Sequence, residues 1–223
     1  MLTDIYQALR QAFGHRGWWP AEGPLEMMVG AVLTQNTNWR NVEKALGALK
    51  RGGLLNVQAL AEVDLGVLQE LIRPAGYYRQ KAPRVQRLAQ WIGNCGDTEA
   101  QALEGLAAMP VDELRRELLA LKGIGPETAD SILLYALRKP VFVVDSYTVR
   151  VLARHGIVAR GSTYEEVQGL FQDALPEDID LWQDYHAQLV EVGKRCCRRR
   201  SPLCSECPLL PLLGQPDLEE DER

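Results

Sequence analysis

The chain has 223 residues, a formal net charge of −5, 46% hydrophobic residues and 25% charged residues. These proportions are close to the globular average, which excludes a disordered or fibrous chain. No apolar run approaches the roughly 18 residues of a membrane span, and the first residues lack the basic and apolar regions of a signal peptide. We therefore expect a cytoplasmic protein without a membrane partner. The acidic balance, taken alone, argues against a nucleic-acid partner.

The acidic charge is concentrated at the end of the chain. Residues 214–223, GQPDLEEDER, hold five acids and one arginine, so the other 213 residues carry a net charge of only −1. Just upstream, KRCCRRR at 194–200 holds five positive charges and no acid. Such a run is either a solvated surface or a patch that contacts phosphates, and one basic patch is enough to contact DNA electrostatically.

Apolar residues recur at helical spacing over most of the chain. The pattern predicts helices, in chain order, over 3–13, 25–34, 38–50, 57–72, 79–92, 111–123, 128–139, 146–156, 163–175 and 181–195. Helix 25–34 is apolar on nearly all sides, which is typical of a buried helix. Only VFVVD at 141–145 resembles a strand, and it is too short and isolated to build a sheet. The predicted fold class is all-α.

Two of these helices are joined by Gly123-Ile124-Gly125, followed by Pro126. The glycines permit positive φ and a close approach of the backbone to another surface, and Ile124 would plug the turn into the core. Proline suits the first position of a helix, whose free N–H groups bind anions. Without further signals, a plain helical hairpin would remain the better interpretation.

Four of the five cysteines are clustered, at Cys196, Cys197, Cys204 and Cys207. Such a cluster in a cytoplasmic protein favours a metal site over disulfides. Iron–sulfur, zinc and a metal-free relic are all compatible with the residues. We expect Cys95 to be a free, partly buried thiol.

The stretch 121–156, LKGIGPETADSILLYALRKPVFVVDSYTVRVLARHG, resembles the helix-hairpin-helix core of the endonuclease III superfamily of DNA glycosylases. AVLTQNTNW at 31–39 and the cysteine-rich end extend the resemblance over nearly the whole chain. The resemblance implies two helical lobes with a DNA cleft between them. One lobe is 21–139 with the hairpin, and the other is 1–20 plus 140–223 with the cysteine-rich loop. We expect a monomer that binds duplex DNA.

In this family the aspartate after the apolar run is catalytic, and the matching residue is Asp145. Residues 141–144 would hold it rigidly, and the next helix N-terminus would stabilise its ionised form. A fixed carboxylate can stabilise the positive charge that builds on the sugar and position a water for attack. A plain N-cap is the alternative interpretation, and both roles can coexist.

Bifunctional family members carry a lysine two residues after the second hairpin glycine, and that position here is Glu127. A carboxylate cannot form an imine, so the resemblance implies a monofunctional glycosylase without Schiff-base lyase activity. Lys122 is nearby but lies in the hairpin, where we expect it to contact phosphate.

With glutamate at this position, the chain resembles the 3-methyladenine DNA glycosylase branch of the family. The same branch is indicated by Trp18, Trp19 and Pro20 before the first core helix and by Trp39 after it. An alkylated purine is electron-poor or cationic, so stacking on tryptophan would select it by cation–π attraction. For Trp18 and Trp19, ordinary core packing is the alternative.

The same branch pairs the glutamate with a late lysine, which implies a Glu127–Lys194 pair. Gln35 stands where the family fills the gap left by a flipped base. The DNA-binding residues implied by the resemblance and the basic run are Gln35, Lys122, Gly123, Ile124, Gly125, Thr128, Arg198, Arg199 and Arg200.

Cys197, Cys204 and Cys207 match the first three ligands of the family's [4Fe–4S] cluster, whose fourth ligand position is Leu213. Cys196, His186 or a non-protein ligand could complete the site. The cluster's role would be structural, shaping the basic loop 198–203.

The sequence thus predicts a monofunctional DNA glycosylase of base excision repair that hydrolyses the N-glycosidic bond of alkylated purines in duplex DNA. A uracil or mismatch glycosylase is one alternative. A lesion-binding module that has lost catalysis is another.

Overall fold

The computed structural model describes residues 1–16 and 19–218. Within these residues every regular element is helical, so the predicted all-α fold is confirmed. The chain divides into two compact units, each described by itself: unit 1 is Met1–Trp18 with Pro140–Arg223, and unit 2 is Trp19–Lys139. Trp19 and Pro20, which the sequence analysis assigned to the other lobe, belong to unit 2. No helix in the described part of the chain is long and apolar enough to cross a membrane.

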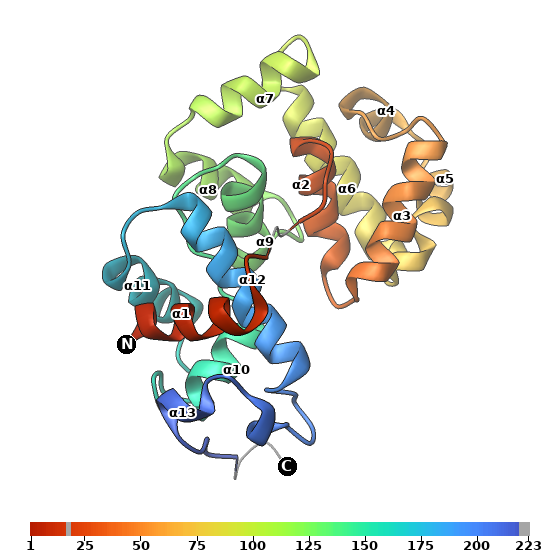
Figure 1. The fold of residues 1–223 in the computed structure, drawn as a ribbon. Helices are drawn as coiled ribbons and strands as arrows, with labels where there is room; N and C mark the ends of the chain where they lie inside the picture. Colours follow the sequence, from red (N-terminus) through yellow and green to blue (C-terminus); the bar gives the residue numbers. More distant parts are fainter. Residues whose placement is uncertain (17–18, 219–223) are drawn as a thin grey trace. The chain divides into compact units, whose positions relative to one another are not determined.

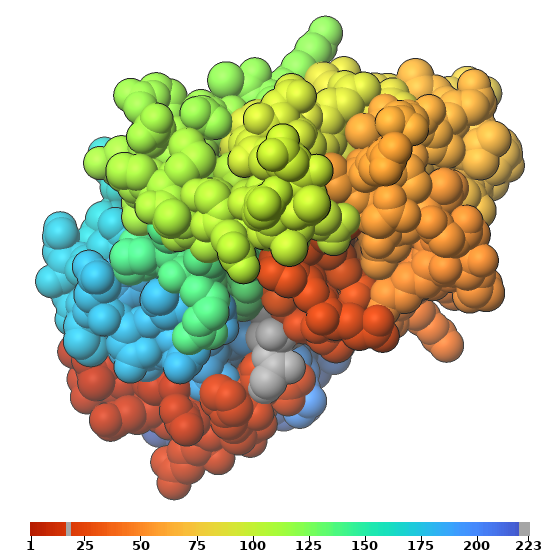
Figure 2. All heavy atoms as spheres, turned by 90° about the horizontal axis from the view of Figure 1, so that it is seen from above, coloured from red at the N-terminus to blue at the C-terminus, as the bar shows by residue number. Residues whose placement is uncertain are grey.

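Unit 2 is built around α2 (Pro24–Thr34), whose side chains are mostly buried, as its apolar sequence predicts. Met28, Val32 and Leu33 are completely buried. Burial of each such side chain stabilises the fold by about 1.5–3 kcal/mol. The other helices of unit 2 are α3 (Trp39–Arg51), α4 (Val57–Glu62), α5 (Leu65–Leu71), α6 (Tyr78–Gly93), α7 (Glu99–Ala108), α8 (Val111–Ala120) and α9 (Pro126–Ser131). Helix α2 lies beside α3 and α6 (Figure 1). In the space-filling view the orange residues of α4 and α5 lie against the yellow α6 (Figure 2).

Two helix predictions in unit 2 are wrong in detail. The predicted helix 57–72 is two helices, because the Asp64 side chain accepts hydrogen bonds from Gly66 N at 2.8 Å and Val67 N at 3.1 Å and so begins a new helix. Helix α7 was not predicted. The capping signal was present, since the Thr98 hydroxyl accepts a hydrogen bond from Gln101 N at 3.3 Å in a Thr-x-x-Gln pattern.

The two hairpin helices are also shorter than predicted. Helix α8 ends at Ala120, and α9 continues after Ser131 as a π-helical turn, Ile132–Ala136. In this turn Leu137 N donates to Ile132 O at 3.1 Å, a five-residue spacing that apolar periodicity does not reveal.

Unit 1 is centred on α12 (Ile179–Arg195), which packs against α1 (Leu2–Phe13) and α10 (Ser146–Arg154). An aromatic core lies beside these helices: Phe142 stacks on Phe171 with ring centroids 4.0 Å apart, and the buried Tyr185 donates to Leu2 O at 2.8 Å. The remaining elements are α11 (Tyr164–Ala174), a short 3₁₀ turn (Cys204–Glu206) and α13 (Leu210–Leu213).

The run Val141–Val144 is buried and, as its short length and isolation predict, does not build a sheet. Side chains of α11 bind its backbone instead of a neighbouring strand. Gln172 Oε1 accepts from Phe142 N at 2.9 Å, Gln168 Nε2 donates to Phe142 O at 2.6 Å, and the Tyr164 hydroxyl accepts from Val144 N at 3.3 Å. These bonds satisfy buried backbone groups without a sheet. They hold in place the segment that ends at Asp145.

Candidate functional site

The predicted hairpin lies between α8 and α9 in unit 2. Gly123 has φ +96°, a conformation that favours glycine, whereas Gly125 is extended and a Cβ added there would meet nothing within 4 Å. Pro126 is the first residue of α9. Ile124 is buried, so its side chain anchors the turn and only its backbone is available to a ligand. The neighbouring Lys122 is exposed.

An ion pair between a buried carboxylate and a partly exposed arginine joins the two hairpin helices. Arg115 Nε of α8 lies 2.7 Å from Asp130 Oδ1 of α9, and Arg115 Nη2 donates to Asp130 Oδ2 at 3.1 Å. Asp130 is completely buried. A two-point contact of this kind fixes the relative orientation of the helices that present the turn.

Gln35 is bonded to the hairpin itself. Its Nε2 donates to Gly123 O at 3.1 Å and to Thr128 Oγ1 at 3.0 Å, and its Oε1 accepts from the Arg84 guanidinium. Thr128 is buried, so its side chain supports Gln35 inside unit 2 and is not a surface group.

Arg84 was missed by the sequence analysis, and 49 residues separate it from Gln35. A Cβ at Gly123 would lie 2.7 Å from Arg84 Cδ and 2.8 Å from Arg84 Cγ. Glycine at 123 is therefore needed for this packing as well as for its φ. No local signal identifies Arg84, because the contact exists only in the folded unit.

The predicted aromatic residues Trp19 and Trp39 lie together in unit 2. Their ring centroids are 5.5 Å apart in an edge-on arrangement, and Trp19 is also 5.1 Å from Tyr135, which the sequence analysis did not single out. Trp19 has φ +72°, a strained value for a tryptophan. A Cβ at Gly30 would lie 3.2 Å from Trp19 Nε1, so glycine makes room for the ring. Trp18 lies outside the described residues, and Pro20 is exposed.

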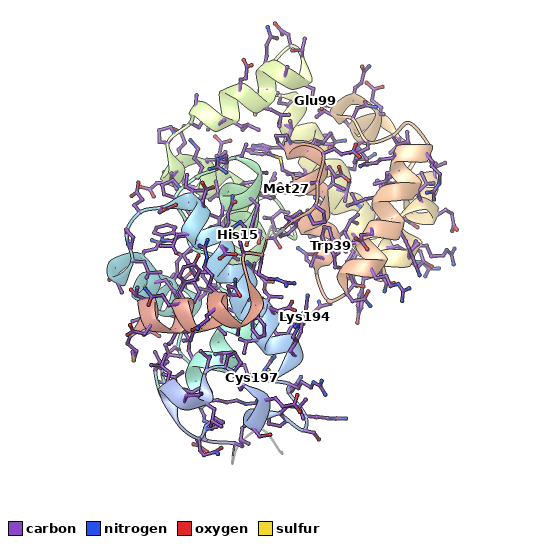
Figure 3. All side chains as sticks on the ribbon, viewed as in Figure 1. His15, Met27, Trp39, Glu99, Lys194 and Cys197 are labelled. Carbon is purple, nitrogen blue, oxygen red and sulfur yellow. The ribbon has the colours of Figure 1, made fainter. Side chains whose placement is uncertain are left out.

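The predicted Glu127–Lys194 pair would join the two units, and it stays a prediction. Glu127 lies in the first turn of α9 in unit 2 and is exposed. Lys194 lies in the last turn of α12 in unit 1, and Cys197 follows shortly after the end of that helix (Figure 3).

Asp145 directly follows the apolar run Val141–Val144 and caps α10. Its Oδ1 accepts hydrogen bonds from Thr148 N at 2.7 Å and Thr148 Oγ1 at 2.9 Å, and its Oδ2 lies 3.6 Å from His186 Nε2. Burial alone would raise the pKa of Asp145, but His186 and the two Thr148 donors outweigh it and hold the pKa below its ordinary value. Asp145 is thus a buried carboxylate that stays ionised. His186 belongs to this group and does not line the cysteine pocket, which corrects its suggested role as a metal ligand.

We expect His186→Gln to raise the pKa of Asp145 toward the ordinary value of about 3.9, because glutamine carries no charge. A carboxyl group with a lowered folded-state pKa stabilises the fold above its unfolded-state pKa, and this contribution is lost as pH falls through the folded-state pKa. The variant should therefore lose stability at a higher pH than the wild type. Carbon-13 NMR titration of the Asp145 carboxyl and unfolding free energies between about pH 3 and pH 7 measure both effects.

His15→Gln is the matched control. His15 Nδ1 lies 3.2 Å from Asp184, and its side chain is 60% exposed. This change should leave the Asp145 titration unaltered. An Asp145 pKa that is identical in the wild type and in His186→Gln would contradict the role given to His186.

The four clustered cysteines line one pocket in unit 1, together with Arg154, His155, Leu210, Gly214 and Pro216. All five cysteines of the chain are outside disulfides. Burial raises the pKa of Cys207 to about 11. Among residues 1–16 and 19–218, no group of three or more His, Cys, Asp or Glu side chains is arranged to hold a metal ion. Leu213, at the fourth ligand position, does not line the pocket.

A buried arginine supports the start of the basic run. Arg154 is 2% exposed, and its Nη1 lies 3.2 Å from Cys197 Sγ. The same guanidinium donates to the carbonyl oxygens of Arg198 at 2.7 Å and Arg199 at 3.1 Å. With their backbone held this way, the side chains of Arg198, Arg199 and Arg200 are exposed, as the sequence predicts for a surface basic run.

Known proteins are similar to this chain over most of its length. A Methanocaldococcus jannaschii protein, whose name gives DNA repair glycosylase as an inferred activity, is 45% identical over 210 residues, which are 94% of each chain. The structure of a Helicobacter pylori 3-methyladenine DNA glycosylase bound to 1,N6-ethenoadenine matches with a TM-score of 0.72 and 28% identity, covering 86% of this chain and 97% of that one. A non-covalent endonuclease III–DNA complex matches with a TM-score of 0.79 and 25% identity, covering 96% and 95%.

The sequence profile of the HhH-GPD superfamily of base excision DNA repair proteins matches residues 29–177. This range contains the hairpin, Gln35 and Asp145, and endonuclease III is among the chain's structural neighbours. The chain therefore belongs to the HhH-GPD superfamily of base excision DNA repair proteins.

Proposed function

We propose that this protein is a monofunctional DNA glycosylase that removes alkylated purines, of the 3-methyladenine kind, from duplex DNA. The reaction hydrolyses the N-glycosidic bond and leaves an abasic site with the strand intact. The observation that carries the proposal is Glu127 in the first turn of α9, directly after the hairpin. A carboxylate at this position has no amine with which to form a Schiff base.

The aromatic group in unit 2 supports the choice of substrate. The Trp19 ring contacts both the Trp39 and the Tyr135 ring. A cationic or electron-poor purine gains more from stacking on such rings than an ordinary base does. The Helicobacter pylori relative is named as a 3-methyladenine glycosylase, and its structure holds an alkylated adenine, 1,N6-ethenoadenine.

Asp145 would carry the chemistry. Its two Thr148 hydrogen bonds fix the carboxylate, and its lowered pKa keeps it ionised at neutral pH. As the glycosidic bond breaks, the electron pair leaves with the base and positive charge develops on the sugar, where a fixed carboxylate stabilises it and orients a water for attack. An alkylated purine is already a good leaving group, so no strong general acid is required.

DNA binding would use exposed groups of both units. In unit 2 these are the backbone of the hairpin and the side chain of Lys122, with Gln35 filling the gap left by the flipped base. In unit 1 they are the exposed Arg198, Arg199 and Arg200. Such contacts to phosphates weaken steeply as salt rises. We propose that a monomer binds the duplex.

We also propose that the cysteine pocket holds a [4Fe–4S] cluster. The fit rests on the donor set, because four thiols outside disulfides line one pocket, and thiolates are the ligands of such clusters. Zinc is the alternative metal for the same thiols. When bound, the cluster supplies a structural crosslink across the loop from Cys197 to Cys207.

The test uses duplexes that carry one defined lesion each: 1,N6-ethenoadenine, uracil opposite guanine, or thymine opposite guanine. DNA treated with dimethyl sulfate supplies 3-methyladenine, whose release is measured by chromatography. We expect release of alkylated purines, with strand cuts that appear only after alkali.

Each other result has a definite meaning. Strand cuts without alkali would contradict the argument from Glu127. Release of uracil or thymine alone would favour the uracil or mismatch glycosylase. Binding to lesions without release of any base would favour the catalytically silent binding module.

A further inference from the structure

The cysteine pocket contains one donor that the family's cysteine pattern does not include. His155 lines the pocket beside Cys196, Cys197, Cys204 and Cys207. It follows α10 directly, and the preceding Arg154 lies 3.2 Å from Cys197 Sγ. His155 is thus held close to the pocket, because its neighbour Arg154 contacts the predicted ligand Cys197.

The Nδ1 atom of His155 is buried and has no hydrogen-bond partner in the described part of the chain. A buried polar atom without a partner costs about 1–3 kcal/mol, so it calls for an explanation, and a bound ion is one such explanation. Imidazole nitrogen is an established ligand of iron and replaces cysteine in some iron–sulfur centres.

Cys196 is the competing donor, and its thiol already has a partner. Cys196 Sγ lies 3.6 Å from Glu206 O, as a donor to that carbonyl. The backbone carbonyl of Cys196 also accepts from Arg198 N at 2.9 Å and Leu203 N at 2.8 Å, which closes the loop 196–203. Cys196 is therefore already used in building the loop.

We propose that His155 Nδ1 is the fourth protein ligand of the cluster, in place of residue 213, and that Cys197, Cys204 and Cys207 are the other three. This inference rests on the proposed cofactor but not on the proposed substrate. A neutral imidazole in place of a thiolate removes one negative charge from the cluster, which raises its reduction potential.

The experiment compares the wild type, His155→Ala, His155→Cys and Cys196→Ser after anaerobic reconstitution with iron and sulfide. Iron content, visible absorbance and pulsed EPR of the dithionite-reduced cluster are measured, with histidine labelled with nitrogen-15. We expect about four irons per chain and a coupled histidine nitrogen in the wild type, as the cluster's composition and the proposed ligand require. Cys196→Ser should retain both signals.

The two variants at residue 155 distinguish loss of a ligand from misfolding. His155→Ala should lose most of the bound iron while keeping the wild-type circular dichroism. His155→Cys should keep the iron, lose the nitrogen coupling and show a lower reduction potential. The inference is overturned if His155→Ala keeps the iron and EPR spectrum of the wild type, or if the wild-type cluster shows no histidine nitrogen. Absence of iron from the wild type overturns the cofactor as well, and base release is scored separately on the same preparations.

Discussion

Asp145→Asn should lower the rate of base release by about 10²–10⁴-fold, the range expected when a group that takes part directly in the reaction is lost. Asparagine retains the oxygen that accepts from Thr148 N and so preserves the cap of α10, but it cannot stabilise positive charge on the sugar. Affinity for lesion-containing DNA should stay close to that of the wild type. Single-turnover base release and fluorescence anisotropy measure the two quantities.

The matched control for this change is Asp178→Asn. Asp178 is exposed and caps α12, where its Oδ1 accepts from Asp180 N at 3.0 Å and Leu181 N at 3.1 Å. The same substitution at a different helix cap should leave base release unchanged. If Asp145→Asn also keeps nearly the wild-type rate, Asp145 is a structural cap alone and the assignment of the reaction to it is wrong.

Asp130→Ala should destabilise unit 2 by about 1.5–3 kcal/mol, the range for hydrogen bonds to charged groups, because the Arg115 side chain is partly exposed to water. Asp130 is completely buried, and the change leaves the Arg115 guanidinium without the two carboxylate bonds that join α8 to α9. Denaturant unfolding followed by tryptophan fluorescence measures the loss, since Trp19, Trp39 and Trp91 all lie in unit 2. Because the hairpin turn lies between these helices, duplex affinity should fall with the stability.

Glu70→Ala provides the comparison for Asp130→Ala. Glu70 pairs with Arg73, and both side chains are more than half exposed. An exposed pair contributes at most about 1 kcal/mol, so this change should barely move the unfolding curve. Equal effects of the two substitutions would mean that the Arg115–Asp130 pair does not hold the hairpin together.

The helices could be predicted where one apolar face repeats without interruption. This holds for α1, α3, α10 and α12, whose bounds lie within about two residues of the predicted ones. The prediction fails where a capping side chain ends one helix and begins another, as Asp64 does between α4 and α5. The apolar run Val141–Val144 resembles a strand but builds no sheet, as its short length and isolation predict.

The site residues divide in the same way. Asp145, the hairpin glycines and Gln35 could be proposed as site residues from motifs, since the family roles are attached to short spacings. Arg84 and His155 could not, because each acts through a contact with residues far along the chain. His186 was suggested as a ligand in the cysteine cluster, but it lies beside Asp145 instead. Its position in the sequence does not reveal this contact.

The apolar run before Asp145 affects how readily this protein aggregates. The four residues Val141–Val144 are uncharged and mostly β-branched, a composition that favours aggregation when it is exposed. Here their side chains are buried, and two glutamines of α11 bind the backbone N–H and carbonyl groups of Phe142. Both α11 and the Trp182 and Tyr185 rings of α12 cover this segment, but only α11 binds its backbone among the contacts described above. Partial unfolding that detaches α11 would therefore free the Phe142 backbone to pair with another copy, so we expect local opening of α11 to promote aggregation.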